Sequence, residues 1–161
     1  MKLIKSLLSL TLLVSTLFIN ANAKENNTIQ RINPPTLVDS SKWGFSQVVI
    51  PPKNGRIVYI SGQFAGDING KITSTTMKGQ IKDTFKNLKY AIQAAGAKPQ
   101  NVLMMRMLIK DFEEKHVDYL YEENIKLFGK HSPASTLIPV PKLAIDEMLF
   151  EIEVTVFLPD E

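Results

Sequence analysis

The chain has 161 residues, of which 44% are hydrophobic and 22% charged, and its formal net charge is +3. This length fits one globular domain, and the ordinary composition excludes a disordered or collagen-like chain. The absence of cysteine excludes disulfides, thiolate metal sites, a cysteine nucleophile and lipid attachment at cysteine. With His116 and His131 as the only histidines, we expect neither a metal site nor a cofactor.

Residues 1–23 have the pattern of a secretory signal peptide. Lys2 and Lys5 precede a 13-residue apolar stretch, Leu7 to Ile19, and Ala21 and Ala23 occupy the positions that a signal peptidase recognises. The stretch is shorter than the ~20 apolar residues that a membrane-spanning helix needs. We therefore expect cleavage after Ala23 and a periplasmic or secreted protein that no membrane retains.

Removal of this segment changes the charge of the protein. The remaining 138 residues carry 17 basic and 16 acidic side chains, a net charge of +1. No run of lysine and arginine with interleaved aromatics remains, so we expect no nucleic-acid partner. A core of this size can hold the fold without disulfides, and oligomerisation could help.

The mature chain begins with a polar segment. Residues 24–41 contain Pro34-Pro35 and predict an extended arm rather than a packed element, so the domain is expected to span residues 42–161. A strand around residues 45–50 and a strand over residues 56–63 follow. The turn signal Pro52-Lys53-Asn54-Gly55 between them is typical of a tight hairpin.

Helical and strand patterns alternate in the rest of the chain. Strands are predicted over residues 101–110, 136–140 and 149–158, and the first, apolar on both faces, is expected to be central and covered. The order β-β-α-β-α-β-β predicts an α+β fold with both helices on one face of the sheet. The two helical stripes consist of apolar residues at three- and four-residue steps: Met77, Ile81, Phe85, Leu88, Ile92 and Ala95, then Val117, Tyr121, Ile125 and Phe128.

Several short motifs accompany this order of elements: Gly44-Phe45-Ser46-Gln47, Ile60-Ser61-Gly62-Gln63, Ala94-Ala95-Gly96, Leu127-Phe128-Gly129 before Ser132-Pro133-Ala134, and the closing Phe150-Glu151-Ile152-Glu153-Val154. Together they resemble the Rid family (YjgF-like, RidA). The resemblance implies a chorismate-mutase-like fold with a mixed sheet. It also implies a homotrimer with a ligand cleft at each subunit boundary, and hydrolysis of 2-imino acids to 2-keto acids and ammonia.

One departure from the family pattern bears on this activity. The family has an arginine directly after Pro-Ala, and a guanidinium can hold a substrate carboxylate by two charge-assisted hydrogen bonds. Ser135 occupies that position here, and Phe45 replaces the family's tyrosine. Glu151 occupies the position of the family's acidic residue, whose carboxylate can position or deprotonate a water molecule. Loss of a charge-assisted pair costs about 2–5 kcal/mol, so we expect the deaminase activity to be lost or altered.

Arg106 is an isolated charge in an apolar strand, where it is costly unless paired. One interpretation has it in a subunit interface, neutralised by Glu151 or Glu153. The other has it in the cleft, where it supplies the charge that Ser135 lacks. Glu151 and Glu153 themselves have a structural alternative as the solvent face of an edge strand. The expected site therefore has one catalytic candidate, Glu151, and five ligand-binding candidates: Phe45, Gly62, Arg106, Ser135 and Thr136.

The sequence thus predicts an exported Rid-like homotrimer that binds a small metabolite, such as one with a carboxylate, in clefts between subunits. The alternative is an enamine/imine deaminase that uses Arg106 or a lysine as a substitute cation. Nucleic-acid cleavage and a pure interaction module are further alternatives, and neither gains support from a net charge of +1 or from a motif.

Overall fold

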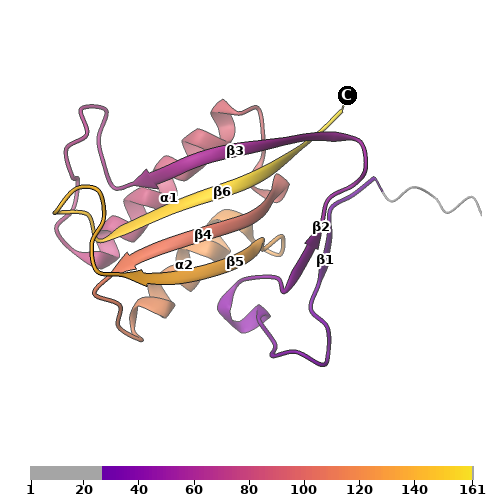
Figure 1. The fold of residues 1–161 in the computed structure, drawn as a ribbon, viewed down its shortest axis with the longest axis horizontal. Helices are drawn as coiled ribbons and strands as arrows, with labels where there is room; N and C mark the ends of the chain where they lie inside the picture. Colours follow the sequence, from indigo (N-terminus) through magenta and orange to yellow (C-terminus); the bar gives the residue numbers. More distant parts are fainter. Residues whose placement is uncertain (1–26, 161) are drawn as a thin grey trace, which may run out of the picture.

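The computed structural model describes residues 27–160, so the expected signal peptide lies outside the described residues. A four-stranded main sheet has the strand order β3-β6-β4-β5 (Figure 1). Its strands are β3 (Gly55–Phe64), β4 (Val102–Lys110), β5 (Ala134–Val140) and β6 (Phe150–Pro159). β4 and β5 run parallel and the other neighbours run antiparallel, so the sheet is mixed.

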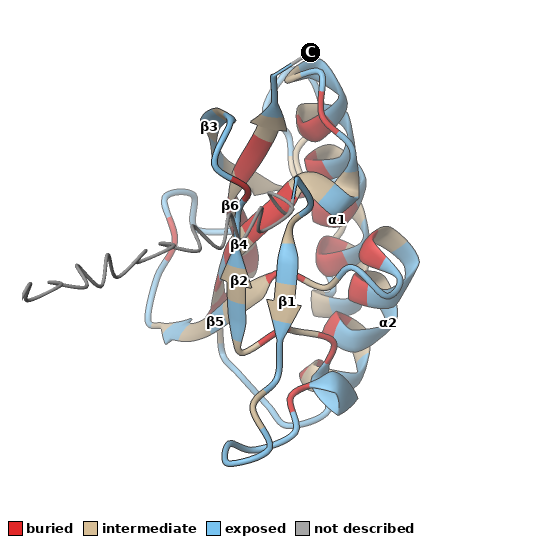
Figure 2. Ribbon diagram, turned by 90° about the vertical axis from the view of Figure 1, so that its right-hand side faces the viewer, coloured by how far each residue is buried: buried red, intermediate tan, exposed pale blue. Residues whose placement is uncertain are grey.

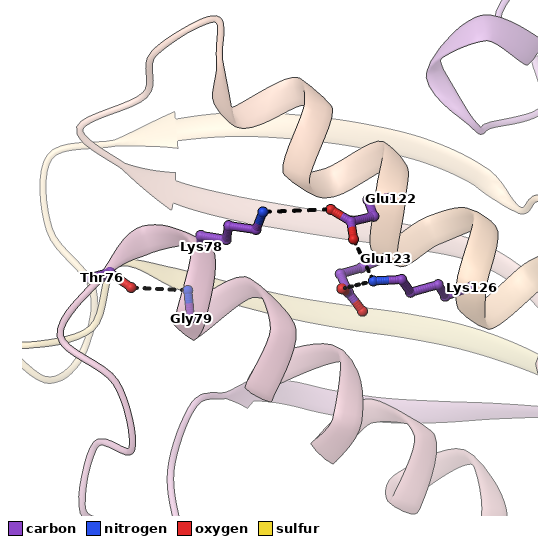
Figure 3. Close-up of polar contacts among 6 residues, drawn as sticks. All are labelled: Thr76, Lys78, Gly79, Glu122, Glu123 and Lys126. Carbon is purple, nitrogen blue, oxygen red and sulfur yellow. Dashed lines mark hydrogen bonds and ion pairs between the residues drawn. The ribbon is translucent and has the colours of Figure 1, made fainter.

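Two helices, α1 (Met77–Ala94) and α2 (His116–Phe128), cover one face of this sheet (Figures 1 and 2), as predicted. α1 begins after Thr76, whose Oγ1 accepts a hydrogen bond from the Gly79 N–H at 3.2 Å (Figure 3). It ends before Gly96, which has a φ of +72° that favours glycine. Among residues 27–160, neither helix has the length and hydropathy that a membrane crossing requires.

One ion pair on the surface joins the two helices, and two more lie within α2. Lys78 lies 3.9 Å from Glu122, and Lys126 contacts Glu122 at 2.6 Å and Glu123 at 3.0 Å (Figure 3). Exposed pairs of this kind stabilise a fold by at most about 1 kcal/mol. The packing of α1 and α2 therefore depends mainly on the core beneath them.

The core fills the space between the helices and the sheet (Figure 2). The rings of Phe85 on α1 and Phe150 on β6 stack with centroids 6.2 Å apart. Gln80 is fully buried, and its amide is satisfied because Nε2 donates to two backbone carbonyls and Oε1 accepts from the Leu149 N–H at 2.8 Å. This amide ties α1 to the chain just before β6.

The N-terminal part of the fold differs from the prediction. β2 (Val48–Ile50) does not form a hairpin with β3; it pairs antiparallel with β1 (Gln30–Ile32) in a separate two-stranded sheet (Figure 1). Pro51 and Pro52 directly after β2 lack the backbone N–H groups that a hairpin ladder needs, which explains the change of partner. The prediction of an unpacked arm is likewise wrong for residues 30–32.

β4 lies between β6 and β5, so its predicted central position is confirmed. Within one chain it is covered on one face only. Met105, Met107 and Ile109 are buried under the helices, whereas Arg106 between them is exposed on the opposite face. The prediction that both faces are covered is therefore wrong for the single chain.

Candidate functional site

The candidate site lies partly on the face of the main sheet that carries no helix, which we call the open face. Ser135, in register with the buried Met105, lies on the helix-covered face instead. Successive side chains of a strand point to opposite faces, and residues paired in register share a face. The residues that these rules place on the open face include Ile57, Tyr59, Met104, Arg106, Leu108, Thr136, Glu151, Glu153 and Thr155. A pocket of about 260 Å³ on this face is lined by Tyr59, Ser61, Met104, Arg106, Glu153 and Thr155.

Arg106 forms an ion pair with Glu153, its register partner on β6. Arg106 Nη2 lies 3.1 Å from Glu153 Oε1, and the two side chains are 56% and 40% exposed. A pair this exposed contributes at most about 1 kcal/mol to stability. Its main effect is on charge, because Glu153, one of the two predicted partners, neutralises the guanidinium.

Glu151 lies beside a β-bulge in β3. The pairing of β3 with β6 shifts between Ile60 and Gln63, so two residues of β3 lie opposite one of β6. A Cβ added to Gly62 in this bulge would overlap Glu151 Oε1. The missing side chain of Gly62 therefore lets the carboxylate lie directly against the β3 backbone.

The surroundings of Glu151 favour its neutral form. Partial burial raises the pKa of the Glu151 carboxyl, and the negative charge of Glu153 raises this pKa further. β6 lies between β3 and β4, so the alternative that these two glutamates line an edge strand is wrong. A carboxyl with a raised pKa is suited to exchange protons with a ligand or water.

Phe45 and Ser135 lie together at the start of β5. Ser46 forms a parallel bridge with Ala134, its N–H donates to the Pro133 carbonyl at 2.8 Å, and its Oγ donates to the Ser132 carbonyl at 2.7 Å. These contacts hold the neighbouring Phe45 at this edge, where its ring stacks on Trp43 at a centroid distance of 6.3 Å.

The single chain separates this group from Glu151. Ser135 lies level with Met105 of β4, whereas Glu151 lies level with Leu108, three residues or about 10 Å farther along the strand. The two residues also lie on opposite sides of β4. Thr136 lies level with Arg106, between the two groups. The six predicted residues thus lie in two groups, one around Glu151 and one around Ser135, rather than in one cluster; we call these groups the half-sites.

Two further features of this face were not predicted as part of the site. Tyr59 is 81% exposed and lines the open-face pocket, and its alternation with the core-facing Val58 and Ile60 is a sequence signal for this position. The only sequence signal for the bulge at Ser61 and Gly62 was the glycine itself. Among residues 27–160, no three His, Asp or Glu side chains gather closely enough to hold a metal ion.

The close contact of Gly62 with Glu151 predicts a strong coupling between these positions. Gly62→Ala is expected to lower the free energy of unfolding by about 1–3 kcal/mol, because the added methyl group displaces the carboxylate. In a Glu151→Ala background the same change should cost much less, since the overlapping atoms are gone. Urea denaturation of the two single variants and the double variant measures this, and strictly additive effects would contradict it.

The raised pKa of Glu151 predicts a pH-dependent stability difference. The folded state binds this proton more tightly than the unfolded state, so stability falls as the pH rises from the ordinary value of 4.5 through the raised folded value. Glu151→Gln should therefore raise the free energy of unfolding at pH 7, and the gain should vanish below about pH 4, where the carboxyl is protonated in both states. Urea denaturation at both pH values checks this; an equal gain at both would contradict it.

Comparisons with known proteins agree with this architecture. Residues 40–158 match the family model described as Endoribonuclease L-PSP. A RutC family protein of Pyrococcus horikoshii is 30% identical over 111 residues, 68% of this chain and 82% of that protein.

Solved structures show the same fold. A protein of the conserved Rid family from Yersinia pestis has a TM-score of 0.76 at 30% identity, over 81% of this chain and 99% of that chain. A member of the YjgF/YER057c/UK114 family from Mycobacterium tuberculosis has a TM-score of 0.54 at 21% identity, over 81% of this chain and 100% of that chain.

Proposed function

The chain belongs to the Rid (YjgF-like) family, whose model is described as Endoribonuclease L-PSP, and from this premise we propose a metabolite-binding function in which the family's 2-imino acid deaminase activity is lost or altered. The ligand is a small metabolite, held in clefts between the subunits of a homotrimer. The predicted signal peptide supports a location in the periplasm or outside the cell.

The observation that carries this proposal is that the open-face pocket offers a substrate carboxylate no unpaired guanidinium. Ser135 stands where the family motif has its arginine, and Arg106, which lines the open-face pocket, is already paired with Glu153 at 3.1 Å. A substrate carboxylate would have to displace Glu153 to bind Arg106. Deaminase chemistry with Arg106 as a substitute cation remains the second candidate, because this side chain is 56% exposed.

The separation of the two half-sites supports assembly with further copies of the chain. Glu151 and Ser135 are too far apart in one chain to bind one small molecule, whereas a cleft between subunits could combine one half from each. The open face also leaves large apolar side chains in solvent, with Tyr59 81% and Ile57 43% exposed. A second copy that covers this face would remove that surface from water.

The family description names an endoribonuclease, but RNA is a less suitable ligand for this chain. Proteins that bind RNA through its backbone rely on clustered positive charge. The chain without its expected signal peptide carries only one excess positive charge, and the open-face pocket has one arginine that a glutamate neutralises. We therefore propose a small metabolite in place of RNA.

Ligand binding and assembly can be tested together. In a thermal-shift screen of carboxylates and sugars at millimolar concentration, we expect at least one compound to raise the Tm of the protein. Sedimentation equilibrium should give three times the mass of one chain. A monomer would contradict the cleft between subunits, and a screen without any stabilising compound would contradict the binding function.

A substitution at Arg106 tests whether this residue takes part in ligand binding. Arg106→Ala removes the ion pair with Glu153 while the family motif at Ser135 stays unchanged. If Arg106 faces the ligand, this variant should lose the thermal shift. If the trimer persists and the shift is unchanged, Arg106 has no part in binding.

A further inference from the structure

A second pocket, of about 280 Å³, lies where the small β1–β2 sheet meets the end of the main sheet, and we call it the arm pocket. It shares no lining residue with the open-face pocket. The lining residues that matter here come from five separate parts of the chain: Ile29, Arg31, Pro52, Asn101, His131 and Phe157. Its volume is slightly below the roughly 300 Å³ at which ligand pockets usually begin, so it suits a compact ligand.

Arg31 supplies a half-buried positive charge to this pocket. Its Nε donates to the Ser132 carbonyl at 3.1 Å, and its Nη2 donates to the carbonyls of Gln100 at 2.9 Å and Val102 at 3.1 Å. These bonds fix the guanidinium in place. Nη1 makes no hydrogen bond within residues 27–160, and no carboxylate of that part of the chain forms an ion pair with Arg31. Burial lowers the pKa of Arg31, as expected for a desolvated cation without a nearby anion.

Two more polar side chains reach the same pocket. Asn101 Oδ1 accepts a hydrogen bond from the Lys98 N–H at 2.9 Å, which orients the amide and leaves its Nδ2 without an acceptor in the described part of the chain. The His131 side chain is exposed, and its ring has no hydrogen-bond partner there either. The pocket therefore combines a fixed guanidinium with an amide donor and an imidazole.

The rest of the lining is apolar. Phe157 is 3% exposed, Pro52 is buried, and Ile29 lies at half-buried depth on the β1 side. Gly55 permits this packing, because a Cβ there would overlap the Phe157 ring. A bare inorganic anion would make no contact with this apolar lining, whereas an anion attached to a compact apolar group would pack against it.

We propose that the arm pocket binds a small organic carboxylate with a compact apolar body. The carboxylate oxygens accept hydrogen bonds from Arg31 Nη1 and Asn101 Nδ2, with His131 as a further donor, and the apolar body packs on Phe157 and Pro52. This site needs neither the open face nor a second subunit, so it is independent of the function proposed above.

Calorimetric titration with benzoate tests this site, with benzamide as the neutral isostere and inorganic phosphate as the bare anion. We expect benzoate to bind, and both benzamide and phosphate to bind at least about tenfold more weakly. Absence of benzoate binding at millimolar concentration would overturn the proposal. If phosphate bound as tightly as benzoate, the proposal that the ligand has an apolar body would be overturned.

Two variants locate the binding. Asn101→Asp keeps the oxygen that accepts from Lys98 and replaces the Nδ2 donor with a negative oxygen, so it should weaken benzoate binding at least about tenfold. Lys98→Gln removes a positive charge nearby that does not line the pocket, and should change the affinity less than twofold. Equal affinity in Asn101→Asp and the native protein would overturn the assignment.

Arg31→Gln should weaken benzoate binding as strongly as Asn101→Asp does. It also removes the three hydrogen bonds from Arg31 that hold β1 in place. The isosteric Asn101→Asp variant is therefore the decisive one. Arg106→Ala separates this site from the open face, since benzoate binding to the arm pocket should survive that change. Loss of benzoate binding in Arg106→Ala would place the ligand in the open-face pocket and overturn the proposal.

Discussion

Phe150→Ala is expected to lower the free energy of unfolding by about 3–5 kcal/mol. Phe150 is fully buried, begins an interior strand of the main sheet, and stacks on Phe85 at a centroid distance of 6.2 Å. Its removal leaves a cavity between α1 and β6 that the rigid strand cannot close. Urea denaturation followed by circular dichroism measures the loss.

A matched control for this variant is Tyr90→Ala on α1. Tyr90 is 56% exposed, so truncation of this ring should change the free energy of unfolding by about 0.5 kcal/mol or less. A similar cost at both positions would contradict the position of the core between the helices and one face of the sheet.

Ser135→Arg is expected to raise the rate of ammonia release from 2-iminopropionate by about two to four orders of magnitude. The change restores the charged group that the family motif places after Pro133-Ala134, and a charge-assisted pair with a carboxylate corresponds to about 2–5 kcal/mol. β5 is an edge strand, so an arginine at its start can extend beyond the sheet. Glu151, the proposed acid, and the Gly62 bulge beside it are already present.

Three variants separate the geometry of this effect from its charge. Thr136→Arg adds the same side chain one residue later, on the opposite face of β5 beside Arg106, and should give no gain. Ser135→Lys adds the charge without the planar fork and should give a smaller gain. Phe45→Tyr with Ser135→Arg restores both family residues and should give at least the gain of Ser135→Arg alone. Equal activity of Ser135→Arg, Thr136→Arg and Ser135→Lys would contradict a specific contact between an arginine at position 135 and the substrate carboxylate.

The sequence predicted the larger elements because each has a period. The stripe predicted for α2 is wrong except at Phe128: the helix buries His116, Leu120, Asn124 and Phe128, whereas Tyr121 and Ile125 are exposed. The apolar stripe of α1 and the alternation of Phe150, Ile152 and Val154 in β6 both follow from burial of one face. β1 escaped prediction because a three-residue strand is too short to show a period. The partner of β2 could not be predicted either, since the Asn54-Gly55 turn signal describes local backbone geometry and not which strand lies alongside.

The sequence predicts the residues of the candidate site but not their arrangement in space. The motifs identified Gly62, Ser135 and Glu151 one by one, yet the register sets Ser135 and Glu151 about three residues apart along β4 and on opposite sides of it. The contact of Gly62 with Glu151 depends on a bulge that one glycine does not specify. The choice of Glu153 over Glu151 as the partner of Arg106 also follows from register alone.

The most direct measurement is ammonia release from freshly generated 2-iminopropionate by the native protein, beside the same protein after heat treatment. Since Ser135 cannot hold a carboxylate and Glu153 occupies Arg106, the native protein should release ammonia no faster than the heat-treated sample. A clearly faster rate that falls in both Arg106→Ala and Glu151→Gln would contradict the loss of deaminase activity and identify Arg106 as the substitute cation.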